Sequence, residues 1–365
     1  MNTLAMHEFH QALGAGFGSL NNAELVTCYG DTSSEYRALR EGAGVLDLSF
    51  RSRLCLAGGD RLRFLHGQVT NDIKGLRPGQ GCYAALVNAK GKMESDLNVF
   101  CLADELLLDF EPGLGAMAAQ RLEKYIVADD VQVVDVAASY GLLSVQGPRA
   151  EQAINELKIF PAVPTQNWTS VSLRDQTLGE LCLINHSRLD SAGFDLFVPV
   201  AALAAAADKL LAAARVMGGL ACGWEAFETL RIENGIPRFG VDMDDTNFPQ
   251  ESGIEATAVS YTKGCYIGQE VLNRIHTMGH VNKQLRSLRL PGAVTALPSR
   301  GDKLYHQGKE VGYVTSSVQS QRLKAGVALG YVRKECNQPG TELEWRAGPG
   351  TAGALCVIEP FSKST

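Results

Sequence analysis

Long apolar runs and an excess of positive charge are both missing from this sequence. No stretch approaches the roughly 18 consecutive apolar residues of a transmembrane helix, and the first 20 residues lack the basic and apolar regions of a signal peptide. The 34 Lys and Arg residues are outnumbered by 40 Asp and Glu residues, so the net charge is −6. Non-specific nucleic-acid binding needs a basic surface. We therefore expect a cytoplasmic protein that contacts neither membranes nor nucleic acid directly, and we take it to be a monomer.

Several motifs of familiar chemistry are also absent. There is no Cys-x-x-Cys pair for zinc or dithiol chemistry, no P-loop and no Gly-x-Ser-x-Gly nucleophile elbow. The glycines of Gly14–Gly18 resemble a dinucleotide-binding loop, but no strand pattern precedes them. His7 and His10, and likewise His276 and His280, have helical spacing without an accompanying set of acidic ligands. We therefore predict no resident metal site.

Nine cysteines are the unusual feature of the composition. An odd number without a signal peptide argues against a disulfide framework, so most of these thiols should be small buried hydrophobes. Cys265 differs because it lies in the segment Lys263–Glu270 (KGCYIGQE), between two glycines. The ammonium group of Lys263, or backbone N–H groups beside Gly264, would lower the pKa of this thiol and favour the reactive thiolate. The alternative is a buried cysteine in a tight turn.

Strand-like and helix-like patterns alternate over the first 280 residues or so, in a chain of 365 residues that is 45% hydrophobic. The length predicts two or three domains, at about 150 residues each. Periodicity and turn residues predict strands at 53–57, 81–87, 95–102, 106–110, 142–145, 180–184 and 194–198. They predict helices at 33–40, from 60 onward, and at 114–127, 147–157, 201–217 and 224–233. Beyond Asn282 the pattern indicates a small all-β domain.

Several segments, in the same order along the chain, are similar to those of one known family. Lys263–Glu270 resembles the K-G-C-[YF]-x-G-Q-E signature of the YgfZ family, folate-binding proteins that support iron–sulfur cluster assembly and repair. Phe64–Ile73 (FLHGQVTNDI), Lys90–Leu97 (KGKMESDL) and Leu230–Pro237 (LRIENGIP) resemble further motifs of that family. C-terminal segments are similar to the barrel domain shared with glycine-cleavage aminomethyltransferases. The resemblance spans most of the chain.

The resemblance implies an α+β fold, namely a three-lobed aminomethyltransferase-like ring around a folate channel. Residues 1–284 would form the folate-binding region of two lobes, and residues 285–365 an antiparallel β-barrel. The implied cofactor is tetrahydrofolate or a derivative, with a transient iron–sulfur cluster shared with a partner. The implied partners are iron–sulfur client proteins, among them a cluster-dependent tRNA-modifying enzyme.

The resemblance also assigns roles to residues. Asp96 corresponds to the carboxylate that aminomethyltransferases place beside the reactive nitrogens of folate, where it would orient and polarise the amine. A carboxylate can bind the edge of a pterin with two hydrogen bonds, and Glu233 is the candidate. The alternative interpretation of Glu233 is an acidic residue on a helix surface. Arg231 would meet the glutamate tail of folate or pair with a neighbouring acid.

The remaining candidates lie in two of the motifs. Thr70 and Asn71 are expected to line the folate pocket, although Asn71 followed by Asp72 is also an ordinary turn pair. In the octapeptide, Cys265 and Lys263 join Asp96 as candidate catalytic residues, and Tyr266 is a candidate folate contact.

Some positions depart from the aminomethyltransferase pattern. Those enzymes carry paired aspartates where this chain has Ser95 and Asp96, and a T-G-Y-T-G-E-D-G-[FV]-E segment where it has residues 187–195. Their folate-contacting glutamate has no clean counterpart here, unless Asp190 replaces it after a one-residue shift. Their asparagine after the next strand has become Phe110 or Glu111, and they lack a cysteine at the position of Cys265.

The leading hypothesis is therefore a tetrahydrofolate-binding accessory protein for iron–sulfur cluster assembly or repair, with Cys265 as a reactive thiol. The alternative is a folate-dependent aminomethyltransferase, in which a one-carbon unit (aminomethyl or methyl) is transferred with tetrahydrofolate. A third possibility is a folate-binding scaffold without turnover.

Overall fold

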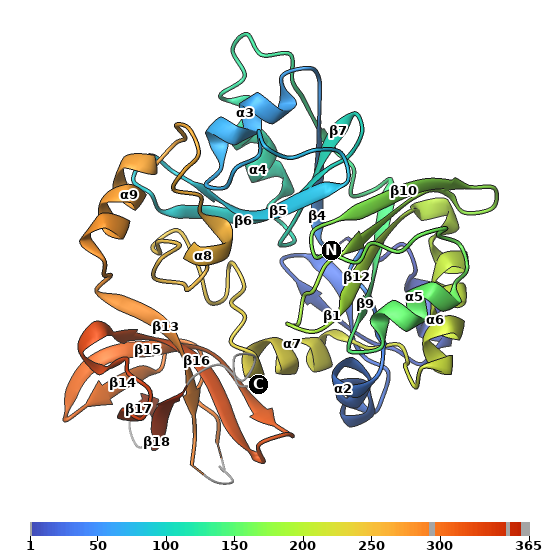
Figure 1. Cartoon of the computed structure of the whole chain (residues 1–365). Helices are drawn as coiled ribbons and strands as arrows, with labels where there is room; N and C mark the ends of the chain where they lie inside the picture. Colours follow the sequence, from blue (N-terminus) through green and yellow to red (C-terminus); the bar gives the residue numbers. More distant parts are fainter. Residues whose placement is uncertain (1, 292–295, 348–350, 359–365) are drawn as a thin grey trace. The chain divides into compact units, whose positions relative to one another are not determined.

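The computed structural model describes residues 2–291, 296–347 and 351–358, and Figure 1 labels its helices and strands. It contains two compact units: residues 1–84 with 96–228, and residues 85–95 with 229–365. The short segment 85–95, which comprises the ends of two strands and the turn between them, groups with the second unit. The sequence-based division at residue 284 stays a prediction.

Two five-stranded sheets provide the framework of the first unit, and every strand pair of known register is antiparallel. One sheet has the order β10-β11-β12-β9-β3, from Ser170–Asp175, Gly179–Asn185, Gly193–Pro199, Tyr140–Gln146 and Gly44–Asp47. The other has the order β5-β6-β7-β4-β8, from Gln80–Val87, Met93–Cys101, Glu105–Phe110, Ser52–Ala57 and Gln132–Asp135. A separate hairpin pairs β1 (Gly16–Leu20) with β2 (Ala23–Cys28).

The helices of the chain up to residue 233 are α1 to α7. They span His7–Ala12, Thr32–Glu41, Arg61–Gln68, Gly115–Glu123, Ala150–Glu156, Leu203–Val216 and Trp224–Glu233. A short 3₁₀ helix, Val200–Ala202, leads into α6.

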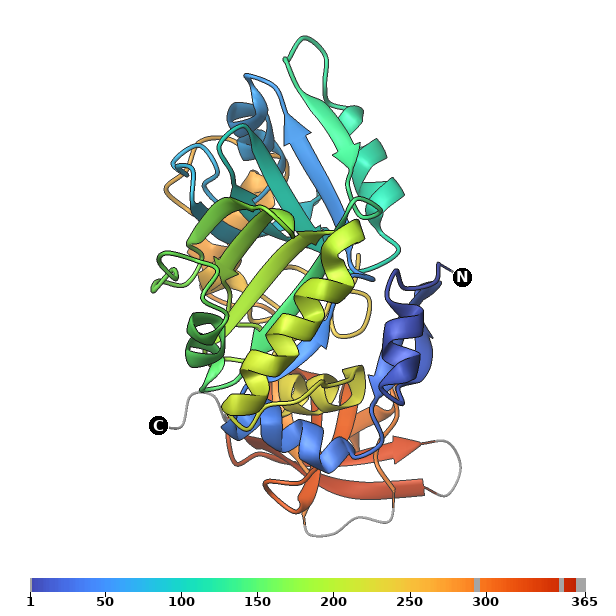
Figure 2. The same ribbon diagram turned by 90° about the vertical axis from the view of Figure 1, so that its right-hand side faces the viewer.

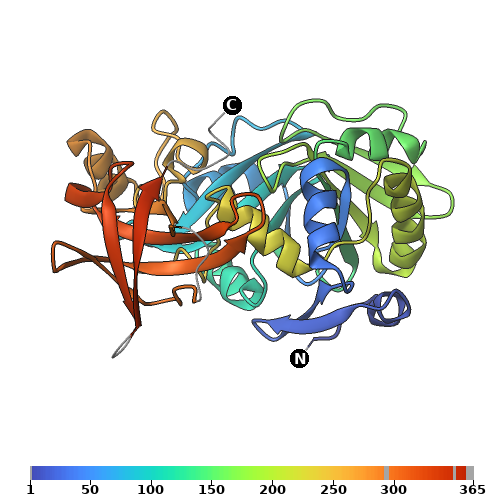
Figure 3. The ribbon, with the colours of Figure 1, turned by 90° about the horizontal axis from the view of Figure 1, so that it is seen from below.

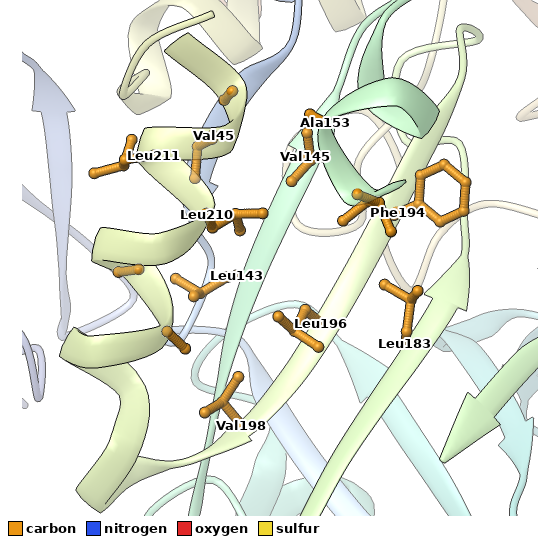
Figure 4. Close-up of a cluster of buried hydrophobic side chains, with 14 of the residues drawn as sticks. Val45, Leu143, Val145, Ala153, Leu183, Phe194, Leu196, Val198, Leu210 and Leu211 are labelled. Carbon is orange, nitrogen blue, oxygen red and sulfur yellow. The ribbon is translucent and has the colours of Figure 1, made fainter. Parts of the chain in front are cut away.

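Helix α6 and the sheet that contains β9 and β12 form a hydrophobic core of the first unit (Figure 2). The alanine-rich sequence of α6 has a high helix propensity, and its buried face carries Leu203, Leu210 and Ala214. In Figure 4 this face lies against apolar side chains of the sheet, including Leu143 and Leu196. Since Leu210 is completely buried, its truncation to alanine should cost about 2–5 kcal/mol of folding free energy.

The second unit ends in a closed six-stranded barrel of order β13-β16-β15-β14-β17-β18 (orange to red in Figure 3). In chain order its strands are Lys283–Arg289, Lys303–His306, Lys309–Ser320, Ala325–Arg333, Glu342–Ala347 and Thr351–Ile358. A 3₁₀ helix follows β16 at Lys334–Cys336, and two helices precede the barrel, α8 (Glu255–Ala258) and α9 (Gln269–Met278). Closure leaves no unpaired sheet edge, and apolar side chains such as Leu288, Leu304 and Val314 fill the interior.

Several elements differ from the sequence prediction. The predicted helix 114–127 ends at Glu123, after which Tyr125 and Ile126 donate backbone hydrogen bonds three residues back in a tight turn, and Val127 is exposed. The patterns also missed α9 and the hairpin of β1 and β2. Across the described ranges, no helix is both long and apolar enough to cross a membrane.

Candidate functional site

Polar side chains form rows across one face of the sheet that contains β6, β7 and β4. Side chains at alternate strand positions share a face, and cross-strand partners are Asn98 with Asp109, and Asp109 with Arg53. Asn98 Nδ2 donates to Asp109 Oδ2 over 2.8 Å. A polar row thus runs over three neighbouring strands of the first unit.

Asp96, the residue that the sequence analysis places beside the reactive nitrogens of folate, is half-buried on β6. The hydroxyl of Tyr83 on β5 donates a 2.7 Å hydrogen bond to Asp96 Oδ2. Burial raises the pKa of Asp96 to about 6, and the nearby carboxylate of Glu111 acts in the same direction. The hydrogen bond from Tyr83 and the positive charge of Arg51 oppose this rise. Burial also raises the pKa of Tyr83 well above 10, so its hydroxyl remains a donor.

Arg51 and Arg188 hold the carboxylates beside this row. Arg51 Nε lies 2.8 Å from Asp109 Oδ1, and its Nη1 lies 2.8 Å from Glu111 Oε1. Arg188 Nη2 lies 2.8 Å from Asp109 Oδ2 and 2.7 Å from Asp195 Oδ2. Although burial by itself would raise the pKa of Asp109, the two guanidinium groups hold that pKa below its usual range.

His186 completes this buried cluster. Its Nδ1 lies 2.7 Å from Asp195 Oδ2, and burial lowers the pKa of His186, with Arg188 adding to the effect. The ring is therefore neutral at pH 7, with its Nδ1 proton directed at the carboxylate. Trp168 packs on the same imidazole, with ring centroids 4.6 Å apart.

Thr70 and Asn71, the predicted pocket residues of the first unit, lie just after α3. Thr70 is fully buried. Asn71 Nδ2 donates to the carbonyl oxygen of Tyr83 over 2.8 Å, so Asn71 is joined to Asp96 through Tyr83. Its Oδ1 also accepts a hydrogen bond from the backbone of Asp72, as the turn interpretation expects.

Cys265 is the exposed cysteine among nine, all of which lie in the described ranges. Lys263 is buried, and its Nζ lies 4.7 Å from the centroid of the Tyr266 ring. Tyr266 is buried as well, and burial raises the pKa of its hydroxyl to about 12. The predicted reactivity of the Cys265 thiol stays a prediction.

Two of the sequence motifs meet beside this thiol, both within the second unit. The octapeptide runs into α9 through Gly268, whose φ of 83° is left-handed. A Cβ there would lie 2.6 Å from the carbonyl oxygen of Asn88, and one on Gly91 would lie 3.2 Å from Val271. The turn between β5 and β6 therefore packs directly against the start of α9, at two glycines that keep the backbones close.

Arg231 and Glu233 are each only 1% exposed, so Glu233 is not an acid on a helix surface. Arg231 Nη1 contacts the carboxylate of Asp242, and its Nη2 donates to Ser316 Oγ over 3.0 Å. Asp242 also accepts a 2.6 Å hydrogen bond from Thr315. The guanidinium thus meets a neighbouring acid, one of the two roles that the sequence left open, and its contact with folate stays a prediction.

Sequence reasoning missed Tyr83, Arg51 and Asp109 as parts of the site. The available signal was charged residues at alternate positions in or beside otherwise apolar strands, such as Arg51 and Arg53. Asp190, the proposed substitute for a glutamate, is exposed at a φ of 56°. Among the residues that the structure describes, no group of three or more His, Cys, Asp or Glu side chains is arranged to hold a metal ion.

Comparisons with known proteins are consistent over nearly the whole chain. Residues 6–263 match the GCVT N-terminal domain, and residues 283–363 match the glycine cleavage T-protein C-terminal barrel domain. An aminomethyltransferase of Halothermothrix orenii is 27% identical, over 94% of this chain and 95% of its own length. One of Shouchella clausii is also 27% identical, over 99% of this chain and 97% of its own.

A solved structure shows the same fold. The glycine cleavage system aminomethyltransferase T from Bartonella henselae superposes with a TM-score of 0.88, at 24% identity, over 98% of this chain and 97% of that one. This confirms the predicted aminomethyltransferase-like α+β fold with its C-terminal antiparallel barrel. The relatives named above are called aminomethyltransferases rather than YgfZ proteins, so the narrower resemblance stays a prediction.

Proposed function

Because the chain belongs to the glycine cleavage T-protein family, we propose that it binds a tetrahydrofolate and transfers a one-carbon unit with Asp96 beside the reacting nitrogen. The names of the relatives favour an aminomethyl group as that unit. The observation that carries the proposal is the setting of Asp96, a half-buried carboxyl group that accepts a hydrogen bond from Tyr83 and has a pKa of about 6.

This setting suits an amine ligand. A bound tetrahydrofolate supplies the amine that accepts the one-carbon unit. Asp96 accepts a hydrogen bond from that N–H, orients it, and takes its proton during the transfer. Tyr83 holds the carboxylate in place, and the raised pKa lets Asp96 take up and return a proton near neutral pH.

Further folate contacts remain proposals. Thr70 and Asn71 in the first unit, and Arg231, Glu233 and Tyr266 in the second, are our candidates. The hydrogen bond from Asn71 to the backbone of Tyr83 supports the choice of Asn71. The burial of Glu233 supports the choice of that residue, because a buried carboxylate is a strong acceptor for polar N–H groups.

The test of this function is transfer from an aminomethyl-lipoyl carrier to tetrahydrofolate, followed as methylene-tetrahydrofolate formation. Asp96→Asn should lower the rate about 100-fold or more, the usual contribution of a positioned acid–base group. Asp104→Asn, an exposed aspartate in the turn after β6, is the matched control and should leave the rate unchanged. Full activity of Asp96→Asn would refute the role of Asp96, and absence of transfer by the wild type would refute the aminomethyl reaction.

A second candidate function rests on the exposure of Cys265. In this function the protein binds tetrahydrofolate and supports iron–sulfur cluster proteins, with the Cys265 thiol acting in redox chemistry or as a ligand. A thiolate is a soft ligand suited to iron. One thiol cannot hold a cluster with the usual four cysteine ligands, so a cluster would be shared transiently with a client protein.

Complementation tests this second function. A strain lacking its own YgfZ-type protein would receive the wild type, Cys265→Ala or Cys28→Ala, the last a half-buried cysteine that serves as the control. The readout is the activity of a cluster-dependent tRNA-modifying enzyme. This second function predicts that only the Cys265→Ala variant fails to complement the strain, while aminomethyl transfer by the same variant in vitro stays normal. Complementation by Cys265→Ala at the wild-type level would overturn it.

A further inference from the structure

Asp96 on β6, Glu111 just after β7 and Arg51 just before β4 lie beside the polar row of the first unit. In the pairing of β6 with β7, Asn98 faces Asp109, and in that of β7 with β4, Asp109 faces Arg53. In antiparallel strands, moving two residues along one strand matches moving two back along its partner. Continued past the last paired residues of β6, β7 and β4, these registers bring Asp96 next to Glu111, and Glu111 next to Arg51.

The contacts agree with this register. Glu111 Oε1 lies 2.8 Å from Arg51 Nη1, and Glu111 is itself buried. On the other side of Asp96, the hydroxyl of Tyr83 donates to its Oδ2. Asp96 thus receives a hydrogen bond from a phenol on β5, and the carboxylate of Glu111 after β7 is close enough to act on it electrostatically.

We propose that Glu111, held by Arg51, is a positioning residue whose negative charge, added to the effect of burial, favours the protonated form of Asp96. The proposal rests on the function proposed above only for its catalytic consequence. Glu111 acts through Asp96 and is not itself required to touch folate.

The charges of the row and of its neighbours support this role. The cluster holds four carboxyl groups, those of Asp96, Glu111, Asp109 and Asp195. It holds three guanidinium groups, those of Arg51, Arg53 and Arg188, and a neutral His186.

Arg51 and Arg188 are both bonded to Asp109, and each has one further carboxylate as a partner. Two carboxyl groups that face each other in a buried place do not both ionise readily. A proton on one of the two relieves this repulsion, and among Asp96, Asp109 and Asp195 it is Asp96 whose pKa is raised.

The consequence for catalysis is a carboxyl group that exchanges a proton in the working pH range. With its proton, Asp96 can donate to a departing amine. Without it, Asp96 can accept the proton of an attacking one. In each direction the proton moves between Asp96 and the nitrogen, and no further reactant is needed.

The decisive experiment follows carboxyl carbons by NMR in the full-length protein labelled with ¹³C at aspartate and glutamate, without folate. Asp96 should titrate near pH 6 in the wild type. In Glu111→Gln, which keeps an oxygen acceptor for Arg51 and removes the charge, the midpoint should fall by about one pH unit or more. In Glu111→Asp, which keeps the charge, it should stay closer to the wild-type value.

Two results overturn the proposal: an unchanged Asp96 midpoint in Glu111→Gln, or an equal fall in Glu111→Asp and Glu111→Gln. The wild type gives a test that needs no variant, because the Glu111 signal must also respond where Asp96 titrates. An Asp96 that titrates alone near pH 4 contradicts the coupling.

The NMR result does not depend on turnover. If aminomethyl transfer is observed, the acidic limb of its pH profile should move downward in Glu111→Gln by the same amount as the NMR midpoint. If transfer is absent but the midpoints behave as expected, the coupling stands and the proposed function fails.

Discussion

Replacing Arg188 by methionine tests whether the buried cluster in the first unit stabilises the fold through charge pairing. Arg188 Nη2 contacts Asp109 over 2.8 Å and Asp195 over 2.7 Å, and its side chain is only 7% exposed. At an effective dielectric constant of about 20, each such pair is worth about 6 kcal/mol of attraction. Burying the guanidinium offsets much of this. Removal of one partner from a buried ion pair typically costs about 3–5 kcal/mol.

We therefore expect Arg188→Met to lose about 3–5 kcal/mol of unfolding free energy. The assay is urea unfolding followed by tryptophan fluorescence, since Trp168 packs on His186 within the cluster. With a urea slope of about 1–3 kcal/mol per molar, the midpoint should fall by about 1 M or more. Arg174→Met, at an exposed arginine of β10, is the control and should change the midpoint little.

A double variant separates charge from packing. Arg188→Met combined with Asp195→Asn removes one of the uncompensated carboxylates and leaves an acceptor for His186. It should be more stable than Arg188→Met alone, because the largest cost of the single change is the buried charge of Asp195 without its guanidinium partner, whereas Asp109 keeps Arg51. A loss below about 1 kcal/mol in the single variant would refute the reasoning, as would a double variant that is no more stable.

Three further predictions follow from the same contacts. First, although burial opposes the effect, Arg188 and His186 lower the pKa of Asp195 from 3.8 to about 2. The ionised Asp195 therefore contributes roughly 2 kcal/mol to the free energy of unfolding above pH 4, and this contribution disappears as the pH falls toward 2. Acid titration of the unfolding free energy checks this, and Asp195→Asn should show a shallower acid limb. Second, Gly268→Ala should lower the thermal unfolding midpoint more than Gly279→Ala. Both glycines have positive φ, but only at Gly268 would the added Cβ lie within 4 Å of a backbone carbonyl, that of Asn88. Equal effects in calorimetry would mean that the close approach to Asn88 is unimportant. Third, native alkylation with a maleimide, read by mass spectrometry of peptides, should modify Cys265 first. Rapid labelling of a different cysteine would count against its exposure.

Local patterns in the sequence were enough to predict much of the framework. The alanine-rich segment predicted α6, and short apolar runs predicted β4 and β7, because helix propensity and apolar patterning act over neighbouring residues. The α+β class and the C-terminal barrel were also expected from the resemblance. Helix α9 was missed, because it is only ten residues long and its sequence lies between glycines.

The sequence also singled out Asp96 and Cys265, whose roles stay predictions. It did so by motif alone, because neither residue is distinguished by its local periodicity. Burial decided what each can do, and burial is a property of the packed chain: Asp96 is half-buried against Tyr83, while Cys265 is exposed.

The pairing of charges in the buried cluster, in contrast, depends on the tertiary structure alone. Arg188 and Asp109 lie 79 residues apart, and Arg51 meets Glu111 across 60 residues. Such pairs depend on which strands become neighbours and in which register, and a shift of one residue would turn every side chain to the opposite face. The sequence by itself thus determined much of the framework and the candidate residues. Strand pairing decided which charges lie near Asp96, and burial together with those charges decided how readily it holds a proton.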